Sequence, residues 1–296
     1  MENSKIILIN KRAGVSSHTV IKEVQKKYNF KKIGHAGTLD PMAEGLLIAM
    51  SNNATKLSDL LMKKNKTYVV KMELGYETDT LDSEGTILKK ANYNVDLLSV
   101  NKVLKEFIGE SYQIPPMFSA IKYKGQKLYK LARKNIQVEL TQRKIFIESF
   151  ENVEYNKGII SFKVTVSSGT YIRSLVRDIA YKLKTYGTMI YLLRERIDKL
   201  CVPQNDEITF YNVQDYFKLN KINLNFNELM HILNGMTLKM DKNIPEESLH
   251  CYFNDEYLGI VNVINSNKIK KSKFFVTKED YEKSKKSCNS CCGDRD

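Results

Sequence analysis

The sequence predicts a mixed α+β fold around a largely antiparallel sheet, followed by a small, mostly β C-terminal part. Several segments alternate apolar and polar residues, which is typical of half-buried strands, and other segments repeat apolar residues at helical spacing. The two kinds of segment interleave without the regular strand–helix–strand order that builds a parallel sheet. The chain has 296 residues, which is enough for two domains.

The first half of the chain contains the clearest strand signals. Strands are predicted at residues 6–9, 45–50 and 67–74, a helix after Ser17, and a second helix at 53–62. Residues 31–41 contain Gly34 and Gly37 and have no helical period, so we expect a loop there. Residues 79–85 are rich in turn formers and predict a turn.

The second half continues the mixture. A helix is predicted from Val100 to Ile108, a strand at 160–166, and a helix opened by Ser168-Gly169-Thr170. A polar, asparagine-rich stretch at 219–225 indicates a boundary, so we predict domains at 1–222 and 223–296. The second domain should contain a helix at 226–233 and a strand at 257–263.

The net charge of the chain indicates the kind of partner that it binds. The chain has 47 basic and 34 acidic residues, a formal charge of +13, which favours a polyanion because each cation set against a phosphate can release a counterion. A lysine-rich proteome would explain the same composition equally well. The N-terminus lacks the apolar core of a signal peptide and no run of eighteen apolar residues exists, so we expect a cytoplasmic protein without a membrane-spanning helix.

The five cysteines indicate neither a disulfide framework nor a metal site. Their number is odd and their spacing uneven. Cys288, Cys291 and Cys292 form a CxxCC tail, but a structural zinc site normally pairs two such motifs and no second one is visible. We therefore expect a disordered tail without metal.

The segment GHAGTLDPMAEGLL, residues 34–47, carries the strongest signal for a functional site. Its three glycines and its proline specify a shaped loop. Asp40 precedes Pro41, which pushes its backbone toward an extended conformation and can aim the carboxylate into a cleft. The alternative is a simple Asp–Pro turn, and the residues alone favour that alternative.

Two further segments contain candidate partners. Arg173, in SGTYIRSL, lies in the first turn of a predicted helix, and a guanidinium keeps a carboxylate ionised in a dry site. Tyr68 begins a predicted strand and could stack on a base. A surface arginine and a core tyrosine are the simpler interpretations.

Basic residues cluster between Lys122 and Lys144. This stretch contains eight lysines and arginines but one acidic residue, Glu139. Tyr123 and Tyr129 lie among the basic residues in the sequence. Basic side chains mixed with aromatic ones suit RNA, and a solvated helix face is the alternative. This stretch belongs to a predicted insertion at about 113–150.

Together these segments resemble the family of bacterial tRNA pseudouridine-55 synthases. The resemblance runs from about residue 5 to 200 and rests on six segments in order: GHAGTLDP, NATK, KTY, GYETDTLD, PPMFSAIK and GTYIR. Residues 233–236 and 258–260 resemble a reduced PUA-type RNA-binding domain. The chain departs from the family in having Arg12 where proline is usual, and in LLRER, residues 192–196, where the pocket leucine is Leu192 or Leu193.

The resemblance implies roles for seven residues. Asp40 would be the catalytic carboxylate, Arg173 its charged partner, and Tyr68 the platform for the uracil and a relay for its proton. The remaining four would contact substrate or support the site: His35, Lys56, Tyr171 and Leu192.

The implied reaction is the isomerisation of uridine 55 in the T-loop of tRNA. A stacked base must be extruded before its glycosidic bond can be reached. The reaction is redox-neutral, so we expect no metal or cofactor, a tRNA T-arm as substrate, and a monomer with no obligate protein partner. Two rival functions remain: a tRNA-folding chaperone that does not use Asp40, and an unrelated hydrolase with a carboxylate nucleophile.

Overall fold

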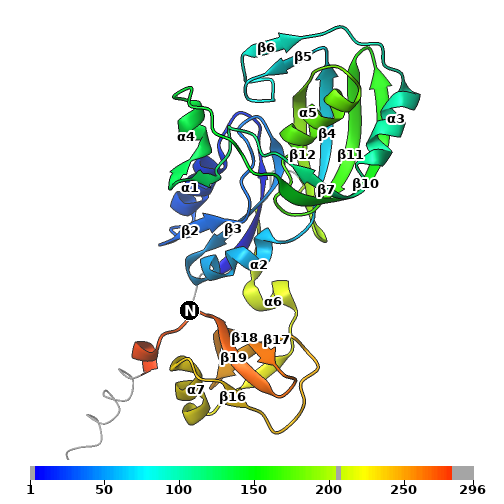
Figure 1. The fold of residues 1–296 in the computed structure, drawn as a ribbon. Coiled ribbons are helices and arrows are strands. Elements are labelled where there is room, and N and C mark those ends of the chain that lie inside the picture. The colour runs from blue at the N-terminus through cyan, green and yellow to red at the C-terminus, as the bar shows by residue number, and fades with distance from the viewer. Residues whose placement is uncertain (1–3, 205–207, 282–296) are drawn as a thin grey trace, which may run out of the picture.

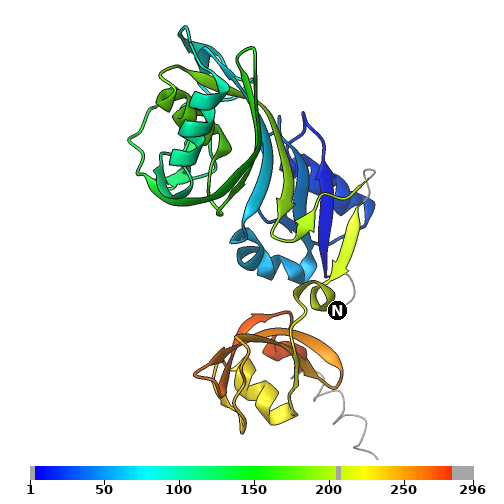
Figure 2. The ribbon, with the colours of Figure 1, turned by 90° about the vertical axis from the view of Figure 1, so that its right-hand side faces the viewer.

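The computed structural model describes residues 4–204 and 208–281. The predicted CxxCC tail lies outside these residues. Figures 1 and 2 show two stacked bodies, with a large mixed sheet above and a smaller β-rich body below the helices α2 Ser58–Met62 and α6 Val213–Phe217. Among the described residues, no helix combines the length and the apolar character needed to cross a membrane.

The large sheet has ten strands in the described part of the chain. Along its main path the order is β14 Thr209–Asn212, β1 Lys5–Lys11, β3 Glu44–Ser51, β12 Gly187–Ile197, β4 Lys66–Leu74, β11 Ile159–Val166, β10 Arg143–Asn156 and β7 Gly109–Gln113. β2 Ile33–His35 pairs with β3, and β13 Leu200–Cys201 pairs with β12. All pairs are antiparallel except β3 with β12, which confirms a largely antiparallel sheet.

Helices cover this sheet and build its core. α1 Ser17–Lys27 begins at Ser16, whose side chain accepts a hydrogen bond from the Thr19 amide, as expected of an N-cap. α3 Leu97–Glu106 and α5 Ile172–Lys182 each bury one apolar face. The predicted 53–62 helix is divided into a 3₁₀ turn, η1 Asn52–Leu57, and α2.

The parallel pair of β3 and β12 explains one motif glycine. Gly45 has φ of 100°, and a Cβ there would clash with the Arg194 carbonyl oxygen and would lie 2.6 Å from Leu193 Cδ1. Only glycine allows β12 to pass this close to the end of the GHAGTLDP loop.

Within residues 208–281, the smaller sheet has five strands in the order β15 Lys221–Asn223, β17 Ser248–Phe253, β18 Glu256–Ile264, β19 Lys268–Phe274 and β16 Leu238–Lys239. α7 Phe226–Leu233 packs on it and begins with a capping box between Asn225 and Glu228. The predicted helix at 226–233 and the strand at 257–263 are therefore confirmed.

Five short elements, in two groups, also belong to the described part of the large body. The hairpin β5 Tyr76–Thr78 with β6 Ile87–Lys90 encloses the predicted turn at 79–85. The segment between β7 and β10 contains β8 Lys122–Tyr123, β9 Gln126–Lys127 and α4 Leu128–Ala132. We call residues 114–142 the insertion. The insertion leaves the large sheet at β7, the edge strand at the opposite end of the main strand order from β14, and Figure 1 draws its helix α4 near α1.

Candidate active site

Asp40 lies on a loop that other residues fix in place. The Ser17 hydroxyl donates to the Leu39 carbonyl and accepts from the Leu39 amide, both at 2.9 Å. On the other side of Asp40, the Pro41 carbonyl accepts from Lys11 Nζ at 3.1 Å and from the Gly14 amide at 2.9 Å. The two residues that flank Asp40 are therefore tied to the start of α1 and the end of β1, which aims the carboxylate.

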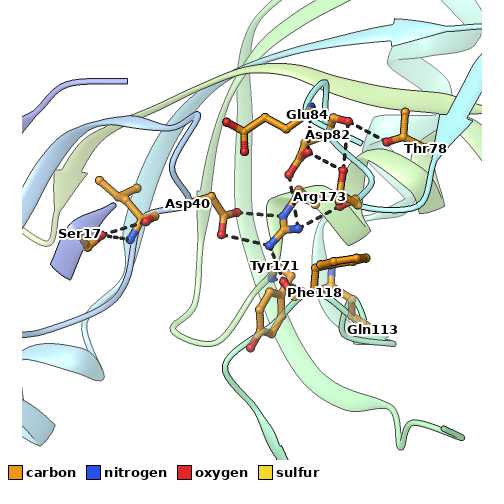
Figure 3. A network of polar contacts seen from close by, with 11 residues as sticks. Ser17, Asp40, Thr78, Asp82, Glu84, Gln113, Phe118, Tyr171 and Arg173 are labelled. Carbon is orange, nitrogen blue, oxygen red and sulfur yellow. Dashed lines mark hydrogen bonds and ion pairs between the residues drawn. The ribbon is translucent and has the colours of Figure 1, made fainter. Parts of the chain in front are cut away.

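Arg173 binds this carboxylate with two nitrogens. Its Nε lies 2.9 Å from Asp40 Oδ2, and its Nη2 donates to Oδ1 at 3.0 Å (Figure 3). Such a bidentate pair fixes both groups in one plane. The Arg173 side chain is 6% exposed and that of Asp40 is 32% exposed, so the carboxylate keeps an open side while its partner is buried.

A turn behind Arg173 completes the charge network. Arg173 Nη1 donates to the Thr80 carbonyl at 2.9 Å and lies 3.4 Å from Asp82 Oδ2. Asp82 also accepts from the Thr80 hydroxyl at 2.6 Å and from the Glu84 amide at 3.2 Å (Figure 3). Leu81, between the two, is buried with φ of 64°, a conformation that a bulky residue rarely adopts. The local backbone is strained where it meets the arginine.

Opposing effects set the protonation of Asp40. Burial is the largest and raises the pKa of its carboxyl, whereas the positive charge of Arg173 lowers it and the negative charge of Asp82 raises it again. The net direction is upward from the ordinary value. Arg173 is thus the largest of the influences that oppose protonation of this desolvated acid.

A cavity of about 300 Å³ opens in front of Asp40. Tyr68 and Leu192 lie on adjacent strands, β4 and β12, and share a face of the sheet because Tyr68 pairs with Arg194 and Val70 with Leu192. The lining also includes Lys66, whose pKa burial lowers to about 8. The lining residues are Gly37, Thr38, Leu39, Asp40, Met62, Lys66, Tyr68, Ala120, Gly169, Thr170, Tyr171, Ile172, Arg173, Leu192 and Arg194.

Comparisons with known proteins give this geometry a context. Residues 25–172 match the family described as TruB family pseudouridylate synthase (N terminal domain). The chain belongs to that family.

Curated relatives match over nearly the whole chain. A tRNA pseudouridine synthase B of Fusobacterium nucleatum is 38% identical over 284 residues, which cover 91% of this chain and 99% of the relative. One of Mycoplasma mobile is 38% identical over 278 residues, covering 93% and 95%. Among solved structures, a chain of a Cbf5-Nop10-Gar1 complex aligns with a TM-score of 0.65 at 21% identity, covering 93% of this chain and 86% of that one, and shows the fold.

Five of the seven residues singled out in the sequence surround the cavity: Asp40, Arg173, Tyr68, Tyr171 and Leu192. Of the two candidate leucines, Leu192 lines the cavity, whereas Leu193 packs over Gly45. The chemical roles of these residues stay predictions.

His35 and Lys56 lie elsewhere. His35 is on β2, outside the cavity lining, and its Nδ1 is buried without a hydrogen-bond partner among the described residues. Burial, followed by the charges of Arg194 and His18, lowers its pKa. Lys56 donates to the Phe274 carbonyl at 2.8 Å, across to the smaller sheet. This hydrogen bond places Lys56 at the junction of the two bodies, and its part in supporting the site stays a prediction.

The sequence did not single out several residues that support the loop. Arg194 is buried and donates from Nε to the Leu46 carbonyl at 2.7 Å and from Nη2 to the Gly37 carbonyl at 3.0 Å. Lys11 Nζ donates to three carbonyls, and burial lowers its pKa to about 8. The available signal was a charged residue close to apolar strand residues, at the end of β1 for Lys11 and inside β12 for Arg194. The loop at Arg12 is stabilised by Lys11, which bonds the Arg12 carbonyl at 2.8 Å.

Proposed function

We propose that the protein is a tRNA pseudouridine synthase that converts uridine 55 of the T-loop to pseudouridine. The observation that carries the proposal is Asp40, a desolvated carboxylate bound by Arg173 at the wall of a cavity, in a chain of the pseudouridylate synthase family. The names of the relatives support tRNA as the substrate.

In this proposal the cavity receives the extruded uracil. Tyr68 lies against the base and Leu192 closes the apolar side. Asp40 starts the reaction as the ionised carboxylate, and Arg173 keeps it ionised. The bond between C1′ and N1 breaks and a bond between C1′ and C5 forms, while a proton leaves C5 and N1 gains one. Atoms and electrons balance without an oxidant or a reductant.

The assignment of regions is part of the proposal. Residues 1–222 form the catalytic domain and 223–296 a reduced PUA-like domain, and the insertion contacts the T-arm. We further propose that the protein acts as a monomer, and in the cytoplasm because the proposed substrate is tRNA.

Incubation of the purified protein with a T-loop minihelix, followed by pseudouridine mapping, tests the function. Asp40→Asn should fold and bind the RNA but form no detectable product, because a neutral amide does not replace a nucleophilic carboxylate. Turnover by the pure Asn variant, with deamidation excluded by mass spectrometry, would contradict the role of Asp40. Binding without product by the wild-type protein would favour the chaperone alternative.

A further inference from the structure

The insertion is attached to the rest of the protein at a narrow base. β7 ends at Gln113 and β10 begins at Arg143, and these two residues are paired in the sheet. The Gln113 side chain is buried, with 3% of the residue exposed, and its Oε1 accepts a hydrogen bond from the Tyr171 amide at 2.8 Å. Tyr171 is the N-cap of α5, the helix that carries Arg173.

Two more contacts tie the outgoing chain to α5. Arg177 Nη2 donates to the Ile114 carbonyl at 3.2 Å, and Arg173 Nη2 donates to the Phe118 carbonyl at 2.9 Å. The first residues of the insertion therefore lie along the start of α5, and Figure 3 shows Gln113, Tyr171 and Phe118 gathered around Arg173.

The contact with Phe118 uses the same nitrogen that binds Asp40. A guanidinium has five N–H groups. Nε faces Asp40, Nη2 donates to both Asp40 and Phe118, and Nη1 donates to Thr80 with Asp82 close by. Because every nitrogen has its partners, a shift of the Phe118 carbonyl changes the position of the guanidinium that binds the carboxylate.

We propose that Gln113 is a positioning residue of the reaction: it fixes the base of the insertion on α5, so that docking of RNA on the insertion is transmitted through Arg173 to Asp40. This inference rests on the proposed function. If the protein binds RNA more tightly when Arg173 is correctly placed, then RNA binding must in turn favour the correct placement of Arg173. This follows because the coupling free energy between the two is reciprocal.

The pH dependence of the reaction reports this coupling. The charged and titratable groups that act on Asp40 or feel its charge come from three parts of the fold: Arg173 and Tyr171 at α5, Asp82 and Glu84 in the β5–β6 turn, and Lys11 on β1. Among them, Arg173 is the largest influence that lowers the pKa of Asp40. A displaced Arg173 leaves that pKa higher, and the acid limb of the rate profile then moves to higher pH.

Gln113→Met tests the proposal, since it keeps the length of the side chain and removes the acceptor. At saturating minihelix we expect a single-turnover rate lower by about ten- to hundredfold, the scale expected for a misplaced catalytic group, with the acid limb at higher pH. Gln113→Glu, which keeps an acceptor oxygen, should recover most of the rate. Gln25→Met is the matched control, because Gln25 on α1 also hydrogen-bonds the backbone, but its Nε2 donates to the carbonyls of Phe30 and Lys31 and not to a residue of α5.

Amide hydrogen exchange at Tyr171 provides a readout that does not need product. RNA binding should slow this exchange in the wild-type protein and not in Gln113→Met. If Gln113→Met fails to fold, Arg177→Met, which removes the tie to Ile114, should give a smaller shift in the same direction.

The proposal is overturned if Gln113→Met shows the wild-type rate and the wild-type pH profile at saturating RNA. This holds even if the variant binds RNA with lower affinity. An unchanged exchange rate at Tyr171 on RNA binding would overturn it as well. Absence of product from the wild-type protein would instead count against the proposed function, and the exchange data would still decide whether the insertion and α5 are coupled.

Discussion

At the scale of single residues, the site is a balance between burial and charge. Burial raises the pKa of the Asp40 carboxyl above its ordinary value. Arg173 lowers the pKa through a bidentate contact at 2.9 and 3.0 Å. In the proposed reaction Asp40 acts as an ionised carboxylate, so the rate should depend on whether burial or the charge of Arg173 dominates at the working pH.

Removing the guanidinium should expose this balance. Arg173→Met lets the pKa of Asp40 rise further, so the ionised fraction begins to fall at a higher pH and the acid limb moves upward. We expect the single-turnover rate to fall by about 10²–10³, as for other removed preorganised donors. Arg173→Lys should recover only part, because an ammonium lacks the planar fork. A wild-type pH profile in Arg173→Met, measured on the minihelix, would rule out this role.

Tyr68 is both a core residue and a cavity residue, since it is buried among apolar side chains and lines the cavity. Tyr68→Phe should keep the stacking surface and lose any proton relay, whereas Tyr68→Leu should lose both. Single-turnover rates separate the roles. A normal rate for Phe with a slow rate for Leu identifies a platform. Normal rates for both variants would leave Tyr68 as a core residue only.

The residue pattern could not pair Asp40 with Arg173, because 133 positions separate them. Taken alone, the residues favoured an Asp–Pro turn and a surface arginine. The ordered series of family-like segments made the pairing an expectation. Lys11, at the end of β1, and Arg194, inside β12, stayed unnoticed because both are charged, and periodicity treats a charged position as solvent-facing although both residues are buried.

At the scale of elements, strands with a regular apolar pattern were predictable from the sequence, and strands with an irregular pattern were not. The apolar runs at 6–9 and 45–50 and the alternating segments at 67–74 and 160–166 predicted strands, and all four are confirmed. β12 and β10 were missed. β12 has register shifts at Met189/Tyr191 and Arg194/Arg196, which displace its side-chain alternation even though the strand lies at the centre of the sheet.

The loop at 31–41 was predicted without regular structure, but β2 lies within it. β2 has three residues, and it pairs with the last three residues of β3, from Ile33 with Ser51 to His35 with Ala49. A pairing this short leaves no periodic signal. Tertiary contact with β3, which the local sequence does not encode, makes it a strand.

The insertion is the element for which charge gives the clearest prediction. Lys127 Nζ lies 5.7 Å and Arg133 Cζ lies 5.6 Å from the centroid of the Tyr129 ring, so basic and aromatic groups form one surface. Neutralising Lys127, Lys130, Arg133 and Lys134 should weaken RNA affinity while single-turnover chemistry at saturating RNA stays near wild type. The slope of log affinity against log salt should fall by about 0.7–0.9 for each phosphate that the variant no longer neutralises. An unchanged slope would identify a solvated face.

At the scale of the whole molecule, the two bodies share a packed junction. Ile260 and Phe275 of the smaller body join the apolar cluster that contains Ile6 and Leu57 of the larger one. Polar contacts surround it: Asn53 Nδ2 donates to the Phe275 carbonyl at 3.1 Å, and Lys273 pairs with Asp59 at 2.8 Å. A junction with both apolar and polar contacts limits how the smaller sheet can turn relative to the cavity.

Lys56 provides a test of what this junction contributes. It was expected to support the catalytic site, yet it bonds the Phe274 carbonyl on the smaller sheet, and burial together with the charges of Lys271 and Lys32 lowers its pKa. We predict that Lys56→Met loosens the smaller body. Affinity for full-length tRNA should then fall several-fold, because that body must be oriented to meet RNA beyond the T-arm.

The minihelix distinguishes the two roles of Lys56. It presents only the T-arm, so its affinity and single-turnover rate should be unchanged in Lys56→Met if the lysine acts at the junction. Lys63→Met is the control, since it removes an exposed lysine just after α2. A slower reaction of Lys56→Met on the minihelix at saturating concentration would indicate that Lys56 supports the catalytic site. Loosening a distant body would not change the reaction rate on an RNA that is too short to reach that body.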